Sequence, residues 1–150
     1  MNKVIILLFS VAFAAAACNL QETGSSYNDG TVELAGKKLN IELADTQDER
    51  AVGLSGREEL NENQGMLFVF DEPSRPGFWM KNMKFGIDII WIRDSHVVDI
   101  SSNLEPEPGR EDYQLKLYQP TVEIDSVLEV NAGWIKKNHI QIGEVMKLQP

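Results

Sequence analysis

The chain has 150 residues, of which 43% are hydrophobic and 25% charged, and its 23 acidic and 14 basic residues give a net charge of -9. This length and composition are typical of one globular domain and exclude a largely disordered chain. The excess of negative charge repels phosphate backbones, so we expect no nucleic-acid partner. With one cysteine and two histidines, the chain lacks an internal disulfide and is a poor candidate for a zinc or His-rich metal site. We expect no metal and no cofactor.

Residues 1–17 have the pattern of an export signal. Lys3 supplies one positive charge, and residues 4–17 (VIILLFSVAFAAAA) form an uncharged apolar run of 14 residues. A membrane-spanning helix needs about 20 residues. The run is therefore predicted to be the hydrophobic part of a cleavable signal rather than a transmembrane anchor.

The apolar run ends in small residues followed directly by Cys18, and the sequence AAAC resembles a bacterial lipobox. Two interpretations compete: Cys18 is lipidated and becomes the first mature residue, or an ordinary signal peptidase cleaves after an A-x-A triplet and the cysteine is incidental. We favour lipidation, because the single cysteine occupies the position that lipidation requires. Residues 18–30 would then be a lipidated cysteine and a polar tether that hold a domain of residues 31–150 at the cell envelope, in the periplasm or outside the cell. A polar terminus without a role is the other interpretation of the tether.

The first half of the predicted domain contains a hairpin and a short helix. Apolar residues alternate with polar ones over residues 32–34 and 39–43, on either side of the turn sequence AGKK. Thr46 and Glu49 form a capping-box pattern, which predicts a helix over residues 47–52 that Gly53 ends. A weaker pattern allows a second helical turn at residues 57–60.

Further strands are predicted from short runs rich in β-branched and aromatic residues. They cover residues 65–70, 77–82, 87–92 and 96–100, a strand pair near Val122 and over 127–131, and a closing strand over 142–148. Residues 131–138 suit one or two helical turns, and residues 104–112 (LEPEPGRED) an exposed acidic loop. Many short strands with regular turns predict a mainly β, single-domain barrel or sandwich with one or two short capping helices.

Five segments, RAVGLSGR, GMLFVF, FWMKN, GIDIIWI and VLEVNAGW, occur in an order and spacing that resemble domain-of-unknown-function family 192 of bacteria and archaea. The resemblance covers residues 32–148. It implies a compact β-rich fold of the jelly-roll or barrel kind, and it implies no established activity. Many members of that family are exported.

The segment FWMKN contains three candidate ligand-binding residues. If it is a strand, Trp79 and Lys81 share one face and Asn82 lies on the other. Trp79 would then be a stacking platform, and Lys81 a charged contact for an anionic or sugar-like ligand. The favoured alternative is structural: the aromatic residue packs, and Lys81 pairs with a carboxylate such as Asp88 or Glu129.

Three charged residues have both a functional and a structural interpretation. Arg50 either clamps a ligand carboxylate or ties the predicted helix to the sheet through Asp88 or a backbone carbonyl, and the tie is favoured. Asp88 and Glu129 lie within apolar strands, where paired carboxylates can perform acid–base chemistry. We favour solvated side chains at both positions, because alternating strands usually expose one face.

Two functions follow from these patterns. The preferred hypothesis is a non-catalytic envelope module that binds an unknown small ligand or an envelope protein, since no nucleophile, metal cluster or cofactor loop is recognisable. The alternative is a hydrolase-like enzyme acting on an envelope saccharide or peptide, with Asp88 or Glu129 and Lys81 as its acid–base groups. The candidate ligand-binding residues are Arg50, Trp79, Lys81, Asn82, Asp88 and Glu129.

Overall fold

The computed structural model describes residues 28–149, and the side chains from residue 30 onward. The expected signal and lipidation site lie outside these residues. The strands are β1 (Asn28–Leu34), β2 (Lys37–Ala44), β3 (Gln64–Ser74), β4 (Ile87–Arg93), β5 (His96–Leu104), β6 (Ile124–Asn131) and β7 (Met146–Gln149). The helices are α1 (Gln47–Val52), α2 (Trp134–Asn138) and a single 3-10 turn, η1 (Asp112–Gln114). The predicted mainly β fold is confirmed, and no helix within residues 28–149 is long and apolar enough to cross a membrane.

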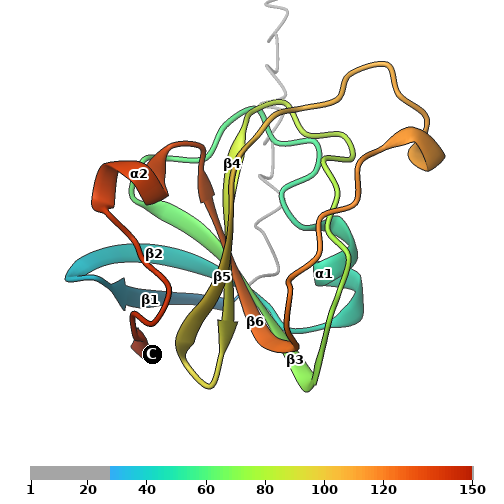
Figure 1. Ribbon diagram of the computed structural model, residues 1–150. Coiled ribbons are helices and arrows are strands. Elements are labelled where there is room, and N and C mark those ends of the chain that lie inside the picture. Colours follow the sequence, from blue (N-terminus) through green and yellow to red (C-terminus); the bar gives the residue numbers. More distant parts are fainter. Residues whose placement is uncertain (1–27, 150) are drawn as a thin grey trace, which may run out of the picture.

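All seven strands belong to one sheet in the order β5-β4-β6-β3-β2-β1-β7. Neighbouring strands are antiparallel except β2 and β3, which are parallel. The two ends of the sheet meet, because the Val97 amide donates to the Glu144 carbonyl at 2.9 Å and the Met146 amide donates to the Ser95 carbonyl at 2.8 Å. The sheet therefore curls into a half-barrel, with α1 and α2 on different sides of it (Figure 1).

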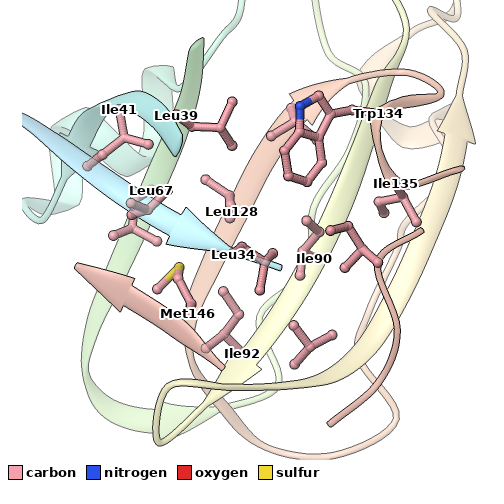
Figure 2. Close-up of a cluster of buried hydrophobic side chains, with 14 residues drawn as sticks. Leu34, Leu39, Ile41, Leu67, Ile90, Ile92, Leu128, Trp134, Ile135 and Met146 are labelled. Atoms are coloured by element: carbon pink, nitrogen blue, oxygen red, sulfur yellow. The ribbon is translucent and has the colours of Figure 1, made fainter. Parts of the chain in front are cut away.

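Buried side chains form two clusters, one on each face of the curled sheet. The inner cluster, shown in Figure 2, contains Val32, Leu34, Leu39, Ile41, Leu67, Ile90, Ile92, Val97, Leu128, Val130, Trp134, Ile135, Ile140 and Met146. The outer cluster contains Ala44, Leu54, Leu60, Met66, Phe68, Met80, Ile87, Ile89, Trp91, Leu104, Ile124 and Val127. Strands β4 and β6 contribute to both clusters and are consequently buried on both faces.

The locally encoded elements form as predicted. In the β1–β2 hairpin Val32 lies opposite Leu39, and Gly36 has a φ of 70° in the turn, a conformation that glycine adopts at little cost. In α1 the Thr46 hydroxyl accepts a hydrogen bond from the Glu49 amide at 3.2 Å, and the Glu49 carboxylate accepts one from the Thr46 amide at 3.1 Å. The helix ends at Gly53, whose amide donates to the Glu49 carbonyl.

Residues 77–82 do not form the predicted strand. Phe78 makes only an isolated antiparallel bridge with Tyr118, and the next residues turn. Two features prevent a regular strand: Pro76 lacks an amide hydrogen to donate, and Asn82 has a φ of 54°, in the left-handed region. The alternation of faces expected along FWMKN is therefore absent.

Other boundaries also differ from the prediction. The strand pair near Val122 is one strand, β6, which begins at Ile124 after a bend at Thr121 and Val122. The closing strand is shorter than expected, because the Gly143 amide donates to β5 instead of continuing β7. Residues 57–60 are irregular, with a bend at Glu58 and no second helical turn, and there Leu60 packs into the outer cluster. Strands β3 and β5 each extend four residues past the predicted ends at residues 70 and 100.

Candidate functional site

A cavity of about 240 Å³ lies on the outer side of the sheet, between α1, the segment that follows α1, and residues 76–79. Its floor contains Phe68, which is 2% exposed, and its rim contains Trp79, which is 48% exposed. The cavity is lined by Gln47, Arg50, Ala51, Val52, Gly53, Leu54, Ser55, Phe68, Phe70, Pro76, Gly77, Phe78, Trp79, Met83 and Glu129. Most of the wall is thus apolar, with a few polar groups.

A row of aromatic rings supports the floor. The Phe68 and Phe78 ring centroids are 5.1 Å apart, and those of Phe78 and Trp91 are 5.5 Å apart, both in edge-to-face geometry. Trp91 is fully buried, and its indole nitrogen donates a hydrogen bond to the Ser101 hydroxyl at 3.0 Å. Edge-to-face pairs of this kind favour one arrangement over others. The floor is accordingly a preformed surface.

Glu129 is the single carboxyl group among the residues that line the cavity. It lies in β6, opposite Met66 of β3 and Ile89 of β4, and is 6% exposed. No described residue donates a hydrogen bond to its side chain. Burial raises the pKa of Glu129 to about 8, and the nearby positive charge of Arg57 opposes this rise. The carboxyl group is therefore mostly protonated at neutral pH.

The expectation that Glu129 is solvated on an open face is wrong. The outer face of the central strands carries a second hydrophobic cluster, and that cluster, together with the segment after α1, covers the side chain. A buried ionisable group with a strongly raised pKa in a cavity is a feature of many functional sites.

Arg57 is a site residue that the sequence did not indicate. It forms a two-pronged ion pair with Glu42 of β2, with nitrogen–oxygen distances of 2.6 and 2.7 Å. Glu42 lies opposite Met66, which itself lies opposite Glu129, so the two carboxyl groups belong to one row across the sheet. Arg57 contacts β2 because of the path that the chain takes after α1. A pattern of neighbouring residues does not predict such a contact.

Arg50 ties α1 to the sheet through backbone carbonyls and not through Asp88. Its guanidinium group donates to the Asp45 carbonyl at 2.5 Å and to the Val69 carbonyl at 2.7 Å. The same group lies 5.3 Å from the centroid of the Phe70 ring. Arg50 also lines the cavity, so the tie places its positive charge at the cavity wall.

Of the three candidates in FWMKN, Trp79 alone lines the cavity. Lys81 forms an ion pair with Asp112 of η1 at 2.5 Å, and its ammonium group lies 5.5 Å from the Trp79 ring centroid. Its carboxylate partner is thus in the acidic loop and is neither Asp88 nor Glu129. The Asn82 carbonyl accepts a hydrogen bond from the Gly56 amide at 2.9 Å, which joins this turn to the segment after α1.

Asp88 is completely buried on the inner face, away from the cavity. Its carboxylate accepts hydrogen bonds from the Ile135 amide at 2.9 Å and from the Asn103 amide at 2.8 Å. The first of these bonds satisfies an amide in the opening turn of α2. The structure therefore does not bring Asp88 and Glu129 together as a catalytic pair. Within residues 28–149, no group of three or more His, Cys, Asp and Glu residues is arranged to hold a metal ion.

Comparison with known proteins gives a family and a fold. The model of one family, described as "Uncharacterized ACR", matches residues 30–148 and is the family that the five sequence segments resemble. A crystal structure of a proposed transcription regulator from Sinorhizobium meliloti 1021 has a TM-score of 0.74 and 28% identity, over 83% of this chain and 96% of that chain. A protein of unknown function from Novosphingobium aromaticivorans DSM 12444 has a TM-score of 0.72 and 31% identity, over 89% and 94%. No curated protein matches the sequence at a significant level.

Proposed function

Since the chain belongs to the DUF192 family, described only as uncharacterized, we propose that its domain binds a small ligand non-catalytically in the cavity beside α1. One observation carries the proposal: an otherwise mostly apolar cavity contains a buried carboxyl group, Glu129, to which no described residue donates a hydrogen bond. Ligand sites are typically apolar hollows with a small number of well-placed polar groups.

The energetic argument concerns the cost of burying Glu129. A polar group that is completely buried without a hydrogen-bond partner costs about 1–3 kcal/mol, and Glu129, which is 6% exposed, incurs part of that cost. An apolar side chain of similar shape would avoid that cost in a purely structural position. A bound ligand that satisfies the carboxyl group would recover part of the cost, while the aromatic wall around Phe68 and Phe78 would supply affinity through apolar burial.

We propose the cell envelope as the place of action, with the domain anchored to a membrane by a lipid on Cys18. The signal-like residues 1–17 and the position of the only cysteine support this proposal. The first strand begins at Asn28, so a short polar segment separates it from Cys18. The transcriptional role ascribed to the Sinorhizobium protein is not carried over, since a net charge of -9 disfavours contact with phosphate backbones.

One observation favours the alternative of a hydrolase-like enzyme: the raised pKa of Glu129 suits a general acid. The acid–base partners considered from the sequence are engaged elsewhere, because Lys81 pairs with Asp112 and Asp88 faces the inner cluster. Ser55, the only hydroxyl side chain in the cavity wall, donates its hydrogen to the Lys81 carbonyl at 2.9 Å. Ligand binding therefore remains the preferred function.

A thermal-shift screen of small aryl and alkyl compounds tests the proposal. Compounds that bind the cavity are expected to raise the melting temperature of the wild type. Their effect should be much smaller in Trp79→Ala, which alters the cavity rim. Tyr113→Ala is the matched control, because Tyr113 is an aromatic residue that is 85% exposed and lies outside the cavity wall.

Two results would reject ligand binding at this site: no compound stabilises the wild type, or Trp79→Ala responds as the wild type does. Mass spectrometry after incubation with envelope saccharides and peptides distinguishes binding from the hydrolase alternative. Unchanged saccharides and peptides support a binding module, whereas hydrolysis that Glu129→Gln abolishes supports the enzyme.

A further inference from the structure

We infer that the ligand of this cavity is an amine, whose ammonium group lies at Glu129 and whose apolar body runs along the aromatic wall to Trp79. The inference rests on the proposed function, because it specifies the ligand of the same cavity. Three features of the structure support it: the electrostatic surroundings of the one carboxyl group, the aromatic rings of the wall, and the shape of the cavity.

The first feature is that no described residue forms an ion pair with Glu129, although the charge of Arg57 acts on it from nearby. Arg57 is the cation that acts on this carboxyl group, and it directs two guanidinium hydrogen bonds to Glu42. Arg50, the only basic residue in the cavity wall, donates to the Asp45 and Val69 carbonyls. Among the described residues no cation contacts Glu129 directly, so a ligand that carries a positive charge would supply the ion-pair partner of an ionised Glu129.

The second feature is the aromatic wall. The faces of aromatic rings attract cations. Two rings of the wall already lie beside a positive charge, since Arg50 is 5.3 Å from the Phe70 centroid and the Lys81 ammonium is 5.5 Å from the Trp79 centroid. Because these two rings already hold a cation each, the aromatic wall supplies apolar area for the body of the ligand, and Glu129 is the group that would hold its ammonium group.

The third feature is the shape of the cavity. Glu129 is almost completely buried, whereas Trp79 at the rim is half-exposed, so the polar end of a ligand would enter first. A cavity of about 150 Å³ accepts a benzene molecule, and this cavity measures about 240 Å³. It has room for one ring and a short chain that ends in an amine.

Binding of an amine has a specific effect on protons. In the free protein Glu129 is mostly protonated below pH 8, because burial raises its pKa to about 8. A bound ammonium group stabilises the ionised carboxylate, so the complex forms with release of up to one proton. Affinity should therefore rise about tenfold per pH unit between pH 6 and pH 7.5, in the range where the carboxyl group of the free protein is protonated.

Calorimetric titration with 2-phenylethylamine and its neutral counterpart 2-phenylethanol tests the inference. We expect the amine to bind at least tenfold more tightly than the alcohol at pH 7.5. We also expect the amine to release close to one proton, measured in buffers of different ionisation enthalpy. Glu129→Gln should lose the preference for the amine, and Glu72→Gln, an exposed glutamate of β3, should keep it.

The possible failures are distinguishable. Equal binding of amine and alcohol, or an amine preference that survives in Glu129→Gln, overturns the amine while the cavity remains a binding site. If neither 2-phenylethylamine nor 2-phenylethanol binds, but other compounds stabilise the protein in a way that depends on Trp79, the amine is likewise overturned and the cavity remains a binding site. If no compound binds at all, the proposed function is rejected too.

A second measurement does not depend on the folding of a variant. The carboxyl carbon of Glu129 can be titrated by NMR in the wild type, with and without saturating 2-phenylethylamine. The inference expects the pKa of Glu129 to fall well below 8 in the complex, and an unchanged or higher pKa contradicts it.

Discussion

Asp88 and Glu129 lie on neighbouring strands, and their carboxyl groups face opposite sides of the sheet. Asp88 is opposite Val130, and Glu129 is opposite Ile89. Because side chains alternate along a strand, this offset of one residue sends Asp88 to the inner face and Glu129 to the outer face. One carboxylate then receives two backbone amides, and the other lines a cavity without a described hydrogen-bond donor.

Asp88→Asn is predicted to destabilise the protein by about 2 kcal/mol, since hydrogen bonds to a buried charged group contribute about 1.5–3 kcal/mol each. The asparagine side chain has one acceptor oxygen for the two amides of Asn103 and Ile135. Urea unfolding measures the change, and Asp71→Asn, an exposed aspartate of β3, is the matched control. Equal stability of the two variants would contradict the capping role of Asp88.

Glu129 should make the protein less stable as the pH rises from about 5 to 8. Its pKa is about 8 in the folded state and near the ordinary 4.5 in the unfolded state, so the folded state holds more protons in this interval. Proton binding by the folded state favours folding at low pH. The free energy of unfolding should consequently fall by up to about 1.4 kcal/mol per pH unit as the pH increases through the interval.

The contribution of Glu129 is isolated by comparing the pH dependence of the wild type with that of Glu129→Gln. The variant should lose this slope and be more stable than the wild type at pH 8. Folding lowers the pKa of Glu49, Glu62 and Asp99. These carboxyl groups change the stability mainly at pH values below their ordinary pKa, which lie outside the interval from pH 5 to 8. Parallel curves for the two proteins would show that Glu129 ionises normally.

Arg50→Gln should loosen α1 and cost about 1–2 kcal/mol of stability, because it removes a charged donor from two backbone carbonyls and a cation from the Phe70 ring. Hydrogen exchange is expected to accelerate at the amides of residues 50–53. Arg110→Gln is the control, since the contacts of Arg110 with Glu107 and Gln114 belong to the acidic loop. Unchanged exchange in α1 would remove Arg50 as the tie between helix and sheet.

Cys18→Ser is predicted to move the protein from the membrane fraction to the soluble fraction, because the lipid anchor depends on the cysteine sulfur. Intact-mass analysis of the wild type should show the added mass of the acyl chains. Ser25→Ala, in the same polar segment, should remain with the membrane. Recovery of unmodified wild type from the soluble fraction would exclude the anchor.

Local sequence patterns correctly predicted the elements that are stabilised by contacts between residues close together in the sequence. The hairpin of β1 and β2, the capping box of Thr46 and Glu49, and the stop at Gly53 each depend on residues a few positions apart. The family was also readable from the sequence, because five segments retain their order and spacing.

Residues 77–82 illustrate what local patterns left undecided. Their composition favours a strand, but the segment follows a proline and ends in a left-handed asparagine, and its residues contact Tyr118 and Gly56 instead of a neighbouring strand. The same reasoning applies to Arg57, whose partner lies on β2. Such contacts join positions far apart in the chain, and the sequence around either partner carries no trace of them.

The sequence alone determined the β-rich class, the first hairpin, the capped helix and the candidate status of Glu129, since alternation, capping and composition act over short distances. Only the tertiary structure decided that both faces of β6 are buried, that Asp88 caps α2, and that Glu129 lines a cavity with a raised pKa. The physical reason is that the electrostatic environment of a carboxyl group depends on everything packed around it. For Glu129 that packing comes from α1, the segment after α1, β3 and residues 76–83, which meet only in the folded chain.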